Sequence, residues 1–252
     1  MMDIFSMLMM LFIGIFGGFI SGLVGIGGAI IIYPAILVLP ILFGFPGYTP
    51  YVASGLTSVQ VFFSTLSGTL RVWKKPAFSP KLIIYMGGGM FVGSSLGALI
   101  ANVIDERMIN IVYVVIAILA LLLMFVKVNV QSKATEFKVI SIVSIGLGIG
   151  IVSGIVGAGG SFIVIPVLLG VFNLPMNTVV ANSIAIAFVS SIGSFAIKLL
   201  QGYVPLTEAL FLIIGSVIFA PIGLRVGQGM SSHVQKSIVS ILIMIAIVQI
   251  IF

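Results

Sequence analysis

The sequence predicts an all-α, polytopic membrane protein made of two inverted-topology repeats, each with about five helical elements. Three observations predict this fold: a very apolar composition, apolar runs of membrane-spanning length, and a glycine-rich motif that occurs twice. Hydrophobic residues make up 61% of the 252 residues and charged residues only 6%, whereas a soluble domain carries about 25% charged residues. The surface of this chain is therefore expected to face lipid.

Apolar runs of about 20 residues cross the hydrocarbon core of a bilayer as helices. The first run begins almost at the N-terminus and has no basic residue ahead of it, so we interpret it as a membrane helix and not as a removed signal peptide. The second run of each half is short for a full span, so we expect it to form a bent hairpin with the run before it. The expected elements are 4–24, 28–43, 52–70, 82–101 and 108–126, then 138–156, 160–172, 177–199, 207–226 and 234–252.

The repeat is clearest in the motif SGLVGIGGAIIIYP at residues 21–34, which returns as SGIVGAGGSFIVIP at residues 153–166. The two copies are identical at eight of 14 positions and lie 132 residues apart. Proline and serine matches continue at an offset of 125 residues, so nearly the whole chain is two copies of one unit. We divide it into a first membrane repeat, residues 1–127, and a second, residues 128–252, which together form one transport domain.

Basic residues are concentrated in a few of the loops. If each hairpin returns to its starting side, nine of the 11 basic residues lie on one face of the membrane, within residues 71–81, 127–138 and 225–236. If each motif region is instead a single span, the division is eight to three. Because basic loops stay in the cytoplasm, we prefer the first division and expect both termini outside, in the plasma membrane. An odd number of elements per half then inverts the second copy, as in many secondary transporters.

The glycines of the motif have two interpretations. Glycine costs about 1 kcal/mol relative to alanine inside a helix, and Gly14 and Gly18 fit close helix packing at four-residue spacing. Gly25, Gly27 and Gly28 instead lie between a long apolar run and a short one, where a helix can stop and restart. A restarted helix presents free N–H groups at the positive end of its dipole and so favours an anion. Packing alone remains the alternative for this cluster.

Inversion predicts that the two glycine tips meet near the membrane centre and bind one small anion. Hydroxyl and amide groups on the third element of each half are expected to complete its coordination, with ordinary interhelical hydrogen bonding as the alternative. The candidate substrate-binding residues are Gly25, Gly27, Gly28, Ala29, Thr57, Ser58, Gln60, Gly157, Gly159, Gly160, Ser161, Asn182 and Ser183.

Several classes of function are excluded by what the spans lack. No carboxylate or histidine lies within a span, and the chain has no cysteine, so we expect no catalytic residue, no metal site and no cofactor. No P-loop occurs, and basic residues in short loops do not favour nucleic acid. Lys198 and Arg225 are expected to snorkel to the interface, with guidance of an anion as the alternative. The acidic residues and the histidine are Asp3, Asp105, Glu106, Glu136, Glu208 and His233.

Paired SGxxGxGGxxxxxP motifs in a small polytopic protein resemble the TauE/SafE family. The resemblance implies a transporter of small sulfur-containing anions, sulfite or organosulfonates, that acts as an exporter by alternating access. An anion channel, a transporter of another oxyanion or carboxylate, and a structural protein whose glycines only pack are the alternatives. The expected partners are a small anionic substrate and the lipid bilayer, and a homodimer is a further alternative.

Overall fold

The computed structural model describes residues 4–25, 27–125, 139–172 and 174–251. Every regular element in these ranges is helical, and each described bound lies within two residues of its prediction. The proposed repeat boundary, at residues 127 and 128, lies outside the described residues. The elements are α1 (Ile4–Val24), α2 (Ala29–Leu42), α3 (Pro50–Val72), α4 (Pro80–Leu82), a π-helical turn η1 (Ile83–Gly87), α5 (Gly88–Ala101), α6 (Glu106–Phe125), α7 (Val139–Val156), α8 (Ser161–Gly170), α9 (Met176–Leu200), α10 (Leu206–Gln228) and α11 (Ser232–Ile251).

Seven of the described helices are long and apolar enough to cross a membrane, and α2 is a shorter apolar helix. The 23-residue α3 is long enough to span but more polar, and its serines, threonines and glutamine are largely buried in the bundle. The chain is thus a multi-pass, all-α membrane protein, as predicted.

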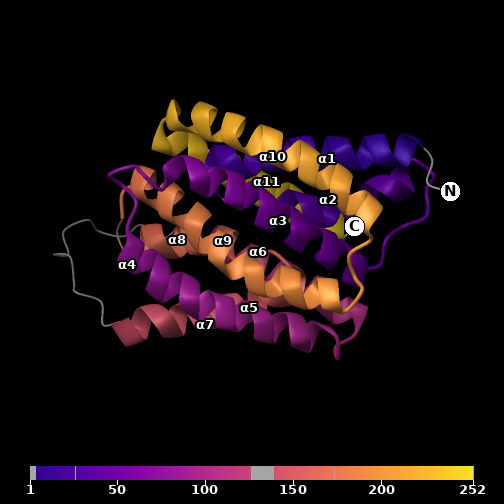
Figure 1. The fold of residues 1–252 in the computed structure, drawn as a ribbon, viewed down its shortest axis with the longest axis horizontal. Coiled ribbons are helices and arrows are strands. Elements are labelled where there is room, and N and C mark those ends of the chain that lie inside the picture. Colours follow the sequence, from indigo (N-terminus) through magenta and orange to yellow (C-terminus); the bar gives the residue numbers. More distant parts are fainter. Residues whose placement is uncertain (1–3, 26, 126–138, 173, 252) are drawn as a thin grey trace.

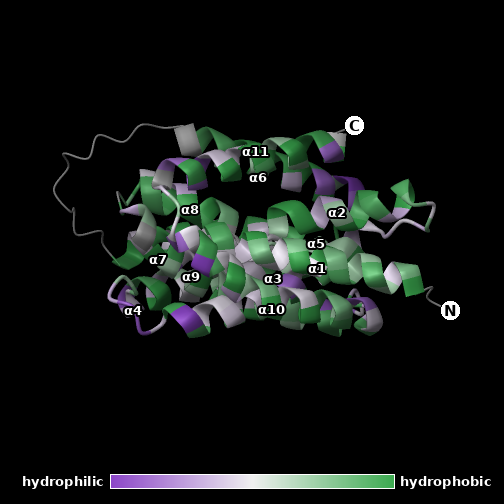
Figure 2. Cartoon of the chain, turned by 90° about the horizontal axis from the view of Figure 1, so that it is seen from above, coloured by the Kyte–Doolittle hydropathy of each residue, from purple (hydrophilic) through white to green (hydrophobic). Residues whose placement is uncertain are grey.

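The helices form layers. Figure 1 shows α3 and α9 crossing the middle of the bundle, with α1 and α10 on one side and α5 and α7 on the other. In Figure 2, α6 and α11 form a separate layer, and α2 and α8 lie between it and the other helices. Equivalent pairs of helices join the two halves: α1 packs on α10 as α7 packs on α5, and α2 packs on α11 as α8 packs on α6.

Glycines let the outer helix pairs approach closely. A methyl group added to Gly14 would lie 2.6 Å from the Leu212 carbonyl oxygen, and one added to Gly18 would lie 2.5 Å from the Ser216 Cα. Contacts this short leave room only for hydrogen at these two positions. Gly14 and Gly18 therefore pack α1 against α10, as the four-residue spacing predicted.

A proline inside α2 leaves a carbonyl oxygen without its usual helical donor, and a tyrosine hydroxyl donates to it instead. Pro34 in α2 has no N–H to donate to the Ile30 carbonyl, and the Tyr113 hydroxyl of α6 donates to that oxygen instead. The Tyr33 and Tyr113 rings stack with their centroids 4.9 Å apart. The short helix after the first glycine tip is therefore held in place by α6.

The two ends of the bundle differ in charge. We call the end formed by residues 71–81 and 225–236 the basic end, and the end formed by residues 44–50, 102–107 and 201–208 the acidic end. The Tyr48 hydroxyl of the acidic end lies 3.4 Å from Oε1 of Glu208. Burial, and to a smaller extent the negative charge of Glu208, raises the pKa of Tyr48 to about 12. The first helix begins and the last helix ends at the acidic end (Figure 1).

Candidate functional site

Both halves of the chain break a helix at the glycine cluster of the motif. The break separates α1 from α2 in the first half and α7 from α8 in the second. All six cluster glycines have positive φ, a backbone region that residues with a Cβ rarely adopt. The φ angles are 83° at Gly25, 69° at Gly27, 76° at Gly28, 77° at Gly157, 60° at Gly159 and 69° at Gly160.

The turn at the first tip lies against α9 of the other half. The Ser183 hydroxyl donates to the Gly25 carbonyl oxygen at 3.1 Å and to the Val180 carbonyl oxygen at 3.2 Å. A methyl group added to Gly25 would lie 3.0 Å from Ser183 Oγ and 3.2 Å from the Val180 side chain. The first tip is therefore fitted closely to the first turns of α9.

The turn at the second tip lies against α3 in the matching way. A methyl group added to Gly157 would lie 2.1 Å from the Ser54 carbonyl oxygen and 3.3 Å from Ser58 Cβ. Ser58 and Ser183 are the serines paired by the 125-residue offset. Two of the sequence-predicted serines thus lie at the two tips, each supplied by the opposite half of the chain.

The restart of α2 lies beside an unpaired amide. Gly28 caps this helix with no hydrogen bond from a side chain, and Ala29 is its buried first residue. A methyl group added to Gly28 would lie 3.2 Å from Gln60 Nε2. Gln60 is 0% exposed, and neither its Nε2 nor its Oε1 has a hydrogen-bond partner. A buried polar side chain without a partner at a helix N-terminus is the feature expected of a ligand site.

The N-terminus of α8 contacts α3 at Val61, the residue that follows Gln60. A methyl group added to Gly159 would lie 2.8 Å from Val61 Cγ1 and 3.4 Å from the Ala187 carbonyl oxygen. Gly160 caps α8, which begins at Ser161, and a methyl group added to Gly160 would lie 2.9 Å from Ser153 Oγ. Both restarted helices thus contact α3, at the consecutive residues Gln60 and Val61.

Two predicted site residues use their polar groups elsewhere in this conformation. The Thr57 hydroxyl donates to the Ala53 carbonyl of its own helix at 2.7 Å. The Asn182 side chain accepts from the Ser79 N–H at 2.8 Å and donates to the Ala77 carbonyl at 2.8 Å. Asn182 therefore holds the loop at the basic end against α9, and its amide is already satisfied.

The predicted position of Lys198 at the membrane interface is wrong. The residue does not snorkel to the interface: its side chain is 0% exposed. Its ammonium group donates to Ser54 Oγ at 2.8 Å and to the Ile155 carbonyl at 3.2 Å, beside the second tip. Among the residues that the structure describes, no carboxylate pairs with it. The buried Lys198 side chain and Gly157 thus both contact Ser54.

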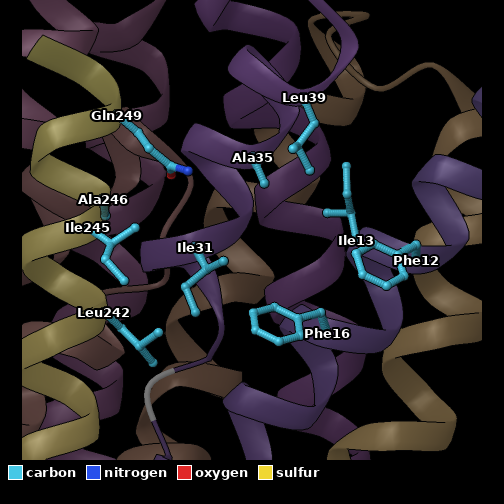
Figure 3. Close-up of a pocket in the computed structure, with 10 residues that line it drawn as sticks. All are labelled: Phe12, Ile13, Phe16, Ile31, Ala35, Leu39, Leu242, Ile245, Ala246 and Gln249. Atoms are coloured by element: carbon cyan, nitrogen blue, oxygen red, sulfur yellow. The ribbon is translucent and has the colours of Figure 1, made fainter. Parts of the chain in front are cut away.

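Two cavities border these elements without containing the tips. One, of about 320 Å³, opens at the basic end and is lined in part by Lys75, Gln228 and Gln235, with Val180 separating it from Gly25. The other, also about 320 Å³, lies between α1, α2 and α11 and is lined almost wholly by apolar side chains such as Phe12 and Phe16 (Figure 3). The first has the polarity of an aqueous approach to the first tip, whereas the second suits hydrocarbon.

Comparison with known proteins assigns the chain to a family. The profile described as sulfite exporter TauE/SafE matches residues 10–250. The chain belongs to the TauE/SafE family. It is 26% identical to the probable membrane transporter protein YunE of Bacillus subtilis over 98% of both chains. It is 25% identical to a probable membrane transporter protein of Methanocaldococcus jannaschii over 93% of this chain and 91% of that one.

The chain is also 27% identical to a probable membrane transporter protein of Haemophilus influenzae, over 84% of this chain and 82% of that one. These names are those of transporters and not of enzymes. No solved structure matches the chain significantly. Family membership therefore makes this protein a membrane transporter of the TauE/SafE family.

Sequence reasoning missed two side chains beside the tips, Ser54 and Ser153, and expected Lys198 at the membrane interface, with guidance of an anion as the alternative. Ser54 gave no usable signal, because it lies near the end of an apolar run and its contact with Lys198 depends on how the halves pack. Ser153 did give a signal, since serine opens the motif in both copies. Its counterpart Ser21 lies 3.0 Å from Ser64, Oγ to Oγ.

Proposed function

We propose that this TauE/SafE protein is a secondary transporter that exports small sulfur-containing anions, sulfite or organosulfonates, by alternating access. The observation that carries the proposal is Gln60, buried and unpaired beside the Gly28 cap of α2. A sulfonyl oxygen accepts hydrogen bonds, so the Gln60 NH₂ group and the free N–H groups of the helix N-terminus can hold it together. The dipole of α2 adds positive potential without a basic side chain.

The charge near the second tip supports an anionic substrate. Lys198 is buried beside Gly157 without a described carboxylate, so its field in this low-dielectric region is weakly screened. A neutral or cationic substrate gains nothing from such a charge. The Lys198 ammonium and the two restarted helices together favour an anion that moves past α3.

The arrangement of the helices supports alternating access. Corresponding helices of the two halves make corresponding contacts, with α3 and α9 packed together at the centre. This is the pattern expected of inverted repeats that exchange roles between two conformations. We infer that the hairpin formed by α1 and α2 and the hairpin formed by α7 and α8 rock against the central pair, with the glycine turns as hinges. The cavity bounded by Val180 is the approach that opens at the basic end.

The charge distribution supports an orientation with the basic end in the cytoplasm of a cell bounded by a plasma membrane. Arg71, Lys74, Lys75, Lys81 and Arg225 all lie at this end. Both termini then lie outside. An anion leaving the cell meets positive charge first and reaches Gly25 next.

Flux from proteoliposomes tests the proposal. Vesicles containing the purified protein are loaded with sulfite, a small sulfonate, sulfate or a carboxylate, and release is measured over time. We expect saturable efflux of sulfite or the sulfonate that is lost in Gln60→Leu protein. Efflux of the carboxylate alone contradicts the substrate class. Ion currents at rates far above the turnover of a carrier would instead identify an anion channel.

A further inference from the structure

A second polar site lies at the basic end, on the outer surface of the bundle. A cavity of about 450 Å³ opens between the last turns of α3 and α10. It is separate from the glycine tips, because neither hairpin contributes to it. The residues that line it are Ser67, Leu70, Arg71, Val217, Ile218, Pro221, Ile222 and Arg225.

The charges at this groove are unbalanced. Arg71 and Arg225 occupy the last turns of their helices, are both exposed, and line the same cavity. Of the carboxylates that the structure describes, all lie at the acidic end, at Asp105, Glu106 and Glu208. Two guanidinium groups that share one cavity repel each other unless an anion lies between them. Planar guanidinium groups bind phosphate oxygens with paired hydrogen bonds.

The walls of the groove are apolar and face outward. Leu70 is 65% exposed, Ile218 is 55% exposed and Ile222 is 41% exposed. They lie on the membrane side of the two arginines, because α3 and α10 both run toward the basic end. An inorganic anion does not use such walls, whereas the acyl chains of a lipid do. The groove therefore fits a molecule with an anionic head and apolar chains.

A hydrogen bond between the two helices fixes their spacing at the groove. Pro221 has no N–H to donate to the Val217 carbonyl four residues earlier. The Ser67 hydroxyl of α3 donates to that carbonyl oxygen at 3.0 Å. The side-chain contact ties α3 to α10 directly beneath the arginines. The groove is thus a feature of the packed helices and not of a loop.

We propose that this groove binds an anionic phospholipid, with the phosphate between Arg71 and Arg225 and the acyl chains along Leu70, Ile218 and Ile222. Basic pockets between membrane helices on the cytoplasmic side are suited to anionic head groups. The occupant bridges the central helix α3 to α10, which packs on α1 of the first hairpin. This site does not depend on which anion the glycine tips transport.

Lipid binding by the full-length protein tests this site. Purified protein in detergent is titrated with phosphatidylglycerol or phosphatidylcholine, and bound lipid is counted by native mass spectrometry. We expect phosphatidylglycerol to bind at least about tenfold more tightly than phosphatidylcholine, and Arg71→Gln/Arg225→Gln protein to lose this preference. The matched control is Lys74→Gln/Lys236→Gln, which removes two charges from the basic end but none from the groove. It should keep the preference.

Three results would overturn the proposal. The first is an equal loss of preference in the lysine control, which would indicate a diffuse surface charge. The second is displacement of phosphatidylglycerol by millimolar inorganic phosphate, which would indicate a site for a free anion. The third is efficient crosslinking of Leu70→Cys protein to a second copy of itself in lipid bilayers. That result would indicate that another copy of the chain, and not a lipid, occupies the groove. A folding defect is detected separately by gel filtration of each variant.

Discussion

The Ser183 hydroxyl donates to the Gly25 carbonyl oxygen at 3.1 Å, joining residues 158 positions apart in the chain. The turn at Gly157 lies in the corresponding place against Ser54 and Ser58. Each glycine tip is therefore seated on the third membrane helix of the other half. A movement of either hairpin must change its contact with α3 or α9, which connects the tips to the centre of the proposed transport path.

Replacing Gln60 with leucine should lower transport and raise stability. The wild-type amide is buried with both polar atoms unpaired, which costs about 1–3 kcal/mol in a folded protein. Leucine removes that cost but also removes the donor that faces the α2 N-terminus. Thermal unfolding without ligand and initial rates of sulfite efflux measure the two effects.

Gln249→Leu is the matched control for this change, because Gln249 borders the apolar cavity between α1, α2 and α11 (Figure 3). It should leave efflux unchanged. A Gln60→Leu protein that is stabilised but transports at the wild-type rate would remove Gln60 from the site.

Valine at Gly28 or Gly160 should abolish transport. Both glycines have positive φ, and a methyl group at Gly28 would lie 2.5 Å from the Gly17 carbonyl oxygen. The side chain blocks the approach to the helix N-terminus and strains the turn. Gly148→Val is the control, since a side chain at that helical glycine meets nothing within 4 Å. Equal efflux from all three variants would leave the doubled motif as a packing device.

Replacing Lys198 with methionine should slow anion efflux by at least about tenfold while leaving the fold intact. An unpaired buried cation does not stabilise a protein, because its desolvation is not compensated. Its loss removes attraction for the substrate together with two hydrogen bonds, to Ser54 Oγ and to the Ile155 carbonyl, which do not fully compensate the desolvation of a buried charge. Arg107→Met removes a charge near the acidic end and serves as the control. Unchanged rates in Lys198→Met protein, over a range of sulfite concentrations, would return Lys198 to a structural role.

Labelling with an impermeant maleimide tests the orientation. The natural chain has no cysteine, so Lys75→Cys and Tyr48→Cys each carry a single reporter. With the basic end in the cytoplasm, Tyr48→Cys reacts in intact cells and Lys75→Cys reacts only after lysis. The reverse pattern would place both termini inside and reverse the proposed order of contact with the substrate.

Local properties of the chain were predictable and long-range contacts were not. The break at Gly25 to Gly28 followed from clustered glycine between two apolar runs, and all described glycines of the two clusters have the positive φ that such a turn requires. The packing of Gly14 and Gly18 followed from their spacing. These features depend on residues close together in sequence, or on small size alone.

The partners of Lys198 and Asn182 were not predictable from the sequence. Lys198 lies near the end of an apolar run, which suggested snorkelling, but Ser54 of the other half and the end of α7 bury it. Asn182 was expected at the tips, yet the loop at Ala77 and Ser79 takes up its amide. In both cases the helix that carries the residue was predictable and the neighbour was not, because the neighbour depends on how two distant halves pack.

The most direct test of the central claim is the position of a bound anion. Selenite is a heavier analogue of sulfite, and this chain has no cysteine with which it would react. Crystals of the protein soaked in selenite can be measured at the selenium absorption edge, with Gln60→Leu crystals as the control. The proposed site predicts an anomalous peak within hydrogen-bond distance of Gln60 and the N-terminus of α2 that disappears in the variant. A peak that persists in the variant, or that lies away from both glycine tips, would contradict it.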